Sequence, residues 1–102
     1  MNCKEELKEH VSEVKKDILC AVVKYEKEWG DFAVFKLTIN YTTDDYVMFL
    51  KNLDFEYDAG FGGQEVCGNM WYTDGTWSER GEYDGSEWWD YKSCPDIPEE
   101  LK

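Results

Sequence analysis

The sequence contains few of the residues from which catalytic and metal sites are usually built. Its 102 residues include a single histidine, His10, and no arrangement of serine, histidine and aspartate that would activate a nucleophile. The four cysteines form no C-x-x-C pair, and one histidine cannot complete a zinc site with them at any usual spacing. We therefore predict that the protein is not an enzyme, with no catalytic residues, no metal and no cofactor.

Long apolar segments are also absent. No apolar run approaches the about 20 residues that a helix needs to cross a membrane. The first residues, MNCKEE, are charged at once and lack the apolar core of a signal peptide. We therefore expect a cytoplasmic protein without a membrane partner. Its cysteines should all be reduced and free: Cys3, Cys20, Cys67 and Cys94.

Positive charge is scarce. The chain has 23 acidic residues against 11 Lys and Arg, for a formal net charge of −12 and a pI near 4.3. Residues 43–102 hold fifteen acids and four bases, whereas residues 1–30 hold seven acids and six lysines. Such a field repels nucleic acid and steers basic partners toward the acidic half. It predicts no direct nucleic-acid binding and favours a partner with a basic surface, although a solvated acidic surface is the plain alternative.

Apolar and aromatic residues are plentiful, at 42% and 17%, which excludes a disordered acidic tail. The length predicts one domain over residues 1–102. Its N-terminal helix, over residues 1–17, is indicated by Leu7, Val11 and Val14, which recur at helical spacing. A short second helix is predicted over residues 44–52, after the N-cap signal Thr42-Thr43-Asp44-Asp45.

The remaining segments read as strands, so the predicted class is α+β with an antiparallel sheet of about five or six strands. A β-hairpin is predicted over residues 18–41, with clean alternation over residues 32–41. Residues 18–28 are interpreted as its first strand, but they could also continue the helix, and the sequence leaves this open. Antiparallel strands over residues 54–92 begin with a short strand that leads into a glycine-rich loop, and residues 93–102 form a surface tail.

The sheet is expected to end in a three-stranded meander. Asp74-Gly75 and Asp84-Gly85 are signals for two-residue type I′ turns. With two-residue loops, paired residue numbers add up to 149 in the first hairpin and 169 in the second. One face then carries Met70, Tyr72, Trp77, Glu79, Gly81, Tyr83, Trp88 and Asp90. The other carries Cys67, Asn69, Trp71, Ser78, Arg80, Glu82, Glu87, Trp89 and Tyr91.

Both faces of this meander are aromatic, so one must pack on the core, and the other is either covered by the tail or exposed as an interaction patch. Arg80 is predicted to lie against Trp89 in a cation–π contact. Two like-charged pairs, Glu79/Asp90 and Glu82/Glu87, fall directly opposite each other, which is unfavourable. A wrong register, a bound cation or a basic partner would each explain them.

The stretch from Leu53 to Pro98 contains DFEYDAGFGGQE, DGTW, RGEYDGSEWW and CPDIP. These elements resemble those of small acidic proteins encoded by bacteriophages and prophages. The resemblance implies no functional residues, because no activity is established for that group. It implies a context, since short acidic phage proteins resemble anti-defence inhibitors, including anti-CRISPR proteins and DNA mimics. In those, carboxylates take the places of phosphates on a basic groove.

These observations together predict an acidic binding protein that inhibits a bacterial nucleic-acid-handling defence machine by occupying a basic groove. The partner would be a basic surface of a host protein or ribonucleoprotein, met in the host cell cytoplasm. The candidate contact residues are Asp74, Glu79, Arg80, Glu82, Asp84, Glu87, Trp88, Trp89 and Asp90. The alternatives are a small-ligand or nucleotide-binding sponge that uses aromatic stacking and the Gly60–Gly63 loop, or a structural protein of the virion. The sequence leaves the oligomeric state open.

Overall fold

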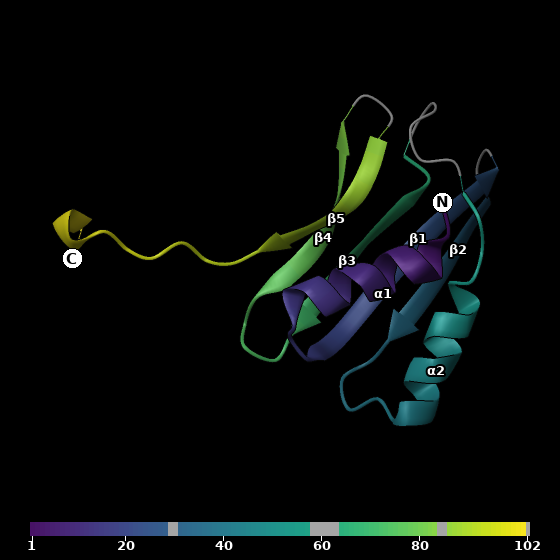
Figure 1. Ribbon diagram of the computed structural model, residues 1–102, viewed down its shortest axis with the longest axis horizontal. Helices are drawn as coiled ribbons and strands as arrows, with labels where there is room; N and C mark the ends of the chain where they lie inside the picture. Colours follow the sequence, from purple (N-terminus) through teal and green to yellow (C-terminus); the bar gives the residue numbers. More distant parts are fainter. Residues whose placement is uncertain (29–30, 58–63, 84–85, 102) are drawn as a thin grey trace.

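The computed structural model describes residues 1–28, 31–57, 64–83 and 86–101. Over these residues the order is α1 (Cys3–Val14), β1 (Ile18–Glu28), β2 (Asp31–Leu37), α2 (Thr43–Asn52), β3 (Val66–Tyr72), β4 (Trp77–Tyr83) and β5 (Ser86–Lys92), before a 3₁₀ turn, Glu99–Leu101. The strands form one antiparallel sheet in the order β2-β1-β3-β4-β5 (Figure 1). The predicted α+β class is confirmed.

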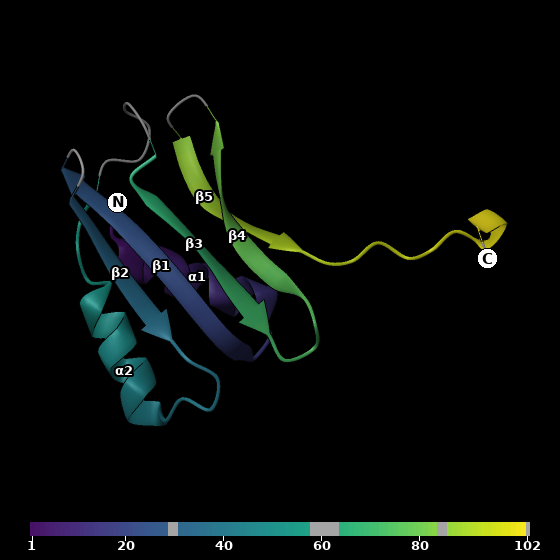
Figure 2. The same cartoon turned by 180° about the vertical axis from the view of Figure 1, so that it is seen from behind.

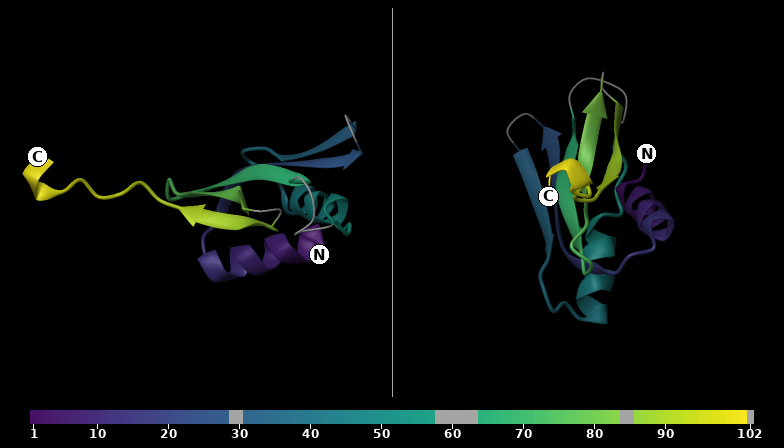
Figure 3. Two further views of the ribbon diagram at one scale, coloured as in Figure 1. Left: turned by 90° about the horizontal axis from the view of Figure 1, so that it is seen from above. Right: turned by 90° about the vertical axis from the view of Figure 1, so that its left-hand side faces the viewer.

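Both helices lie against the same face of the sheet, and the opposite face carries no helix (Figures 2 and 3). The core fills the covered side. α1 contributes Cys3 and Leu7, α2 contributes Phe49, and the strands contribute side chains such as Met70 and Tyr72, all of them buried. We call the bare side the open face. No helix in the described part of the chain is long and apolar enough to cross a membrane.

The helix ends follow local signals in the sequence. The side chain of Asn2 accepts a hydrogen bond from the Glu5 amide at the start of α1, and Thr42 forms a reciprocal capping box with Asp45 at the start of α2. α1 ends at Val14 because Lys15 takes a left-handed conformation, with φ of 59°. This break leaves residues 18–28 free to form β1, so the strand interpretation of that segment is confirmed.

Two predicted strand segments are wrong. Residues 38–41 do not extend β2: they turn, with Asn40 at a φ of 69° and the Tyr41 amide bonded to the Thr38 carbonyl. Residues 54–57 make no strand, only the isolated bridge of Asn2 to Glu56. Their backbone pairs with the two residues before α1, and that partner is too short for a ladder. The rest of the predicted glycine-rich loop lies outside the described residues.

The first hairpin of the meander differs from prediction by one residue. The observed partners are Asn69–Glu79, Met70–Ser78 and Trp71–Trp77, whose numbers add up to 148. The loop has three residues, because the Tyr72 amide bonds to the Thr76 carbonyl and the Gly75 amide to the Tyr72 carbonyl. Gly75 has a φ of 87°, the left-handed position that closes a three-residue hairpin. The second hairpin has the predicted register, in which paired residue numbers add up to 169. Its turn, Asp84-Gly85, lies outside the described residues.

This one-residue difference exchanges the predicted faces of β3 relative to β4, because side chains alternate along a strand. Met70 and Tyr72 lie on the same side as Ser78 and Trp89, and all four are buried. The open face therefore receives Trp71 together with Trp77, which sequence reasoning had assigned to opposite faces.

The four cysteines are free thiols, as predicted. Cys3 is buried in the core, and this burial raises the pKa of its thiol to about 12. Cys67 and Cys94 are exposed, whereas Cys20 is half-buried.

The pairing of β1 with β3 depends on a glycine, and this generates a test. A Cβ atom placed at Gly68 would lie 2.4 Å from the Val22 carbonyl oxygen and 3.1 Å from the Val23 Cα. Gly68→Ala should therefore cost about 2–3 kcal/mol or more in the free energy of unfolding, measured by urea titration. Gly75→Ala is the matched control, because a Cβ atom at Gly75 would have no other atom within 4 Å. Only the positive φ of this residue should then lower the free energy of unfolding, by about 1–2 kcal/mol. Equal losses in the two variants would contradict the β1–β3 pairing.

Candidate interaction surface

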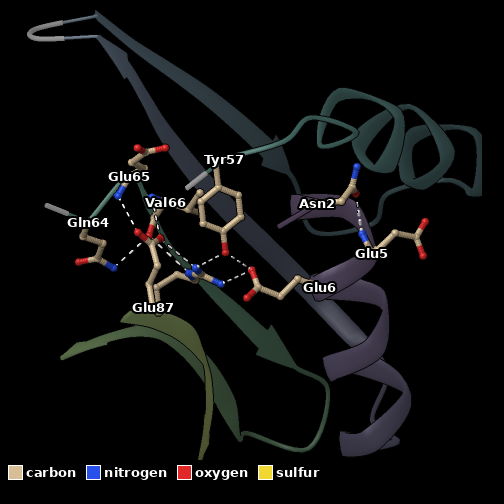
Figure 4. Close-up of polar contacts among 9 residues, drawn as sticks. Asn2, Glu5, Glu6, Tyr57, Gln64, Glu65, Val66 and Glu87 are labelled. Carbon is tan, nitrogen blue, oxygen red and sulfur yellow. Dashed lines mark hydrogen bonds and ion pairs between the residues drawn. The ribbon is translucent and has the colours of Figure 1, made fainter. Parts of the chain in front are cut away.

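The only arginine of the chain, Arg80, is buried on the covered side of the sheet, with a side chain only 1% exposed. Its Nη1 lies 2.7 Å from Glu6 Oε1 on α1, and its Nη2 lies 2.9 Å from Glu87 Oε1 on β5. Nη2 also donates to the Tyr57 hydroxyl at 2.9 Å. Figure 4 shows Glu6, Tyr57 and Glu87 converging at this point. One guanidinium thus joins three segments that are distant in the sequence.

Glu87 is the most enclosed member of this network. Its Oε1 accepts a 3.0 Å hydrogen bond from the Val66 amide as well as the contact from Arg80, and its Oε2 accepts a 2.8 Å bond from the Glu65 amide. The side chain is fully buried. Both oxygens are therefore occupied by internal donors, so Glu87 ties the start of β3 to β5. Its predicted role as a surface contact is not compatible with this burial, and the charge opposite Glu82 is explained by Arg80.

The pKa shifts of the network follow from its burial. Desolvation disfavours the Arg80 charge, but the carboxylate of Glu6 and the contacts to Tyr57 and Glu87 outweigh it and raise the pKa of Arg80. Burial, together with the hydrogen bond that Tyr57 donates to Glu6, raises the pKa of the Tyr57 hydroxyl. The guanidinium stays charged and the phenol stays neutral, which is the arrangement that the hydrogen bonds require.

Trp89 belongs to the core and not to the surface. The guanidinium carbon of Arg80 lies 5.3 Å from the centre of the Trp89 ring, so the predicted cation–π contact is confirmed. The ring of His10 stacks on Trp89 with a centroid distance of 6.2 Å. Glu6, Glu9, His10, Glu13, Trp88 and Trp89 line a shallow hollow beside β5, of about 160 Å³. The Trp89 indole nitrogen is buried without a hydrogen-bond partner among the described residues.

The open face presents a patch of tryptophans. Trp71 and Trp77 are directly paired across β3 and β4, and Trp71 is 41% exposed. Four residues further along β4, Trp88 of β5 is 40% exposed and lies against its cross-strand partner Gly81: a Cβ at that glycine would be 2.8 Å from the indole nitrogen. Residues 93–101, which follow β5, lead away from the sheet (Figure 2). Trp71 and Trp88 are exposed on the open face, and Trp77 is half-buried. Exposed aromatic patches of this kind mark interaction sites.

Two carboxylates lie between these tryptophans. Glu79 and Asp90 are direct cross-strand partners, in the row between the Trp71–Trp77 pair and Trp88. Lys92 Nζ lies 3.0 Å from Glu79 and 3.8 Å from Asp90, which offsets part of their repulsion. One lysine shared by two carboxylates leaves a net negative charge within the patch. We name Trp71, Trp77, Glu79, Trp88 and Asp90 the tryptophan patch.

The other predicted contact residues lie apart from this patch. Asp74 is in the first hairpin loop, where hydrogen bonds from Thr76 and Lys16 lower the pKa of its carboxyl to about 2. Glu82 is exposed on β4, and Asp84 lies outside the described residues. The structure thus brings together only Glu79, Trp88 and Asp90 from the predicted set on one exposed surface. No group of three potential ligands among the described residues is placed to hold a metal ion.

Sequence reasoning missed three residue pairs that matter here. Nothing in the local pattern marks Glu6 or Tyr57 as partners of Arg80, because they are 74 and 23 residues away from it. The Trp71–Trp77 pair was missed because of the register. A three-residue alternative for the Thr73-Asp74-Gly75 loop would have found it.

The chain matches no protein-family model, no curated protein and no solved structure.

The Arg80 network predicts opposite outcomes for two glutamates that face each other. If Glu82 and Glu87 only repelled each other, neutralising either one would not lower the free energy of unfolding. Glu87→Gln instead removes the charge that pairs with a buried guanidinium, and we expect a loss of about 3 kcal/mol in unfolding free energy. Glu82→Gln, at an exposed position, should stay within about 0.5 kcal/mol of the parent chain. Urea unfolding of both variants measures this, and an unchanged Glu87→Gln would refute the network.

His10 provides a pH-dependent test. Its Nε2 lies 2.7 Å from Ser78 Oγ, and burial lowers its pKa below 6.5, with Arg80 acting in the same direction and Glu13, Asp90 and Glu6 opposing. As the pH falls through about 6.5, the unfolded chain takes up a proton that the folded chain resists, so stability should fall.

The measurement is an NMR titration of this single histidine, with His10→Gln as the control for stability. We expect a native pKa below 6.5, and a shallower loss of stability between pH 7 and pH 5 in the variant. A native pKa at or above 6.5 would show that burial does not dominate at His10.

Proposed function

We propose that this chain is an acidic binding protein that uses the tryptophan patch to dock on a basic surface of another macromolecule. The observation that carries the proposal is the exposed Trp71, paired with the half-buried Trp77, beside the carboxylates of Glu79 and Asp90. Tryptophan is one of the residues enriched at the energetic centres of protein interfaces, because it buries a large apolar area and keeps one polar group. Carboxylates among them select a basic partner.

The net charge of −12 supports the same type of partner. Some of the acids are already paired: Glu6 and Glu87 pair with Arg80 inside the fold, and Asp74 pairs with Lys16 at the surface. The remaining exposed carboxylates act mainly at a distance, by steering a basic partner and opposing nucleic acid. We place the specific contacts on the patch and assign the long-range attraction to the rest of the surface.

The more specific hypothesis is inhibition of a bacterial nucleic-acid-handling defence machine, by occupation of its basic groove in the host cytoplasm. It rests on the resemblance of the chain to small phage proteins and on its charge. A nucleotide sponge and a virion component stay as alternative predictions. The Gly60–Gly63 loop that the sponge would use lies outside the described residues.

The proposal is tested by capture of a partner from bacterial lysate, followed by surface plasmon resonance at two salt concentrations. Neutralising Glu79, Glu82 and Asp90 together should cost about 1–3 kcal/mol of binding, mostly as a slower on-rate that high salt reproduces. Trp77→Ala should cost about 2 kcal/mol or more, mostly as a faster off-rate.

The matched control is Ile39→Ala, which truncates a side chain 58% exposed in the turn after β2. It should leave both rate constants unchanged, and melting curves verify that each variant is folded. If the affinity for the captured partner is unchanged by salt and by the triple neutralisation, occupation of a basic groove is excluded. If the affinity is unchanged by Trp77→Ala, the tryptophan patch is not the binding site.

A further inference from the structure

Residues of both helices line an open hollow of about 330 Å³ with a character unlike the rest of this acidic chain. Three lysines line it, Lys4 and Lys8 from α1 and Lys51 from the last turn of α2. Its apolar lining comes from Val47 and Leu50 of α2. Three of the 11 basic residues of the chain therefore meet at one apolar site.

Two of these lysines have no ion-pair partner in the described part of the chain. Lys4 lies 3.5 Å from Asp54, the one acidic residue of the lining, and 3.6 Å from Glu5. Neither Lys8 nor Lys51 lies within 4 Å of a described carboxylate, although acids outnumber bases twofold. Val47 is 59% exposed beside them. The hollow thus offers positive charge next to exposed aliphatic surface, which suits an acidic segment that carries aliphatic side chains.

The chain itself contains such a segment. Residues 93–101, which we call the arm, follow β5 and are exposed along their whole length. Ile97 and Leu101 are 63% and 73% exposed, and acids such as Asp96 and Glu100 lie next to them. Large aliphatic side chains on a solvated arm gain free energy wherever a partner surface can cover them. In Figure 1 the arm leads away from the helices, toward the opposite end of the longest axis from α2.

We propose that the arm of one copy docks into the lysine-lined hollow of a second copy, with Ile97 and Leu101 against Val47 and Leu50 and with Asp96 and Glu100 near Lys8 and Lys51. About nine extended residues span up to about 30 Å, which is enough to cross to a neighbouring molecule. The arm points away from the hollow of its own chain, so a second copy is the recipient that the geometry favours.

Exchange of two identical arms closes a twofold dimer, in which each copy gives one arm and receives one. Two arms of about nine residues supply less contact than the about 20–30 residues on each side of a standard interface. The dimer is therefore weak and concentration-dependent. It leaves the tryptophan patch uncovered, because the hollow is on the helical side of the sheet, and it does not depend on the proposed function.

Sedimentation equilibrium tests the proposal at protein concentrations from about 1 μM to about 1 mM, the range of dissociation constants expected for a weak dimer. The parent chain should move from monomer to dimer. Removal of the arm, or the double substitution Ile97→Ser and Leu101→Ser, should raise the dissociation constant at least about tenfold. These residues are exposed, so the variants should fold normally.

A charge exchange identifies the hollow as the recipient. Lys8→Glu with Lys51→Glu, and separately Asp96→Lys with Glu100→Lys, should each weaken self-association about tenfold, and an equimolar mixture of the two should restore it to within about threefold. Lys24→Glu with Lys36→Glu makes the same charge change on the open face and should leave the parent dissociation constant unchanged. A chain that stays monomeric throughout, a dimer that persists without the arm, or a mixture that does not associate would each overturn arm exchange.

Discussion

The Arg80 guanidinium links three parts of the molecule that lie far apart in the sequence. It reaches Glu6 on α1, Tyr57 before β3 and Glu87 on β5, and the Glu87 carboxylate in turn holds the amides of Glu65 and Val66. A charge that is 1% exposed is tolerated only when it is paired and hydrogen-bonded on every side. Pairing of this one buried charge therefore stabilises the position of α1, the entry into β3 and the attachment of β5.

The need to pair this buried charge divides the acids of the chain into two groups. On the covered side, Glu6 and Glu87 serve the guanidinium, while on the open face Glu79 and Asp90 share the exposed Lys92. The first group is structural and the second faces solvent among tryptophans. A net charge of −12 gives no information on this division. It follows from the placement of both helices on one face, which leaves the other face without cover.

The local steps of the fold could be predicted well from the sequence. The alternation in β2, the capping box at Thr42 and the turn signals of the meander each depend on a few neighbouring residues. The error in the first hairpin has a specific cause. Asp-Gly predicts a tight turn but does not distinguish a two-residue loop from a three-residue loop closed by a left-handed glycine. Gly75 takes the second form, and one residue of slip exchanges the faces of a strand.

By itself the sequence determined the α+β class, the free thiols and the contact of Arg80 with Trp89, since these follow from periodicity, from cysteine spacing and from one cross-strand register. Only the tertiary structure decided which carboxylates are buried and which tryptophans are exposed. Burial depends on contacts between residues far apart in the chain, such as Arg80 and Glu6, which are separated by 74 positions. No local pattern encodes such a pair, because its energy exists only once α1 packs on the sheet and removes both charges from water.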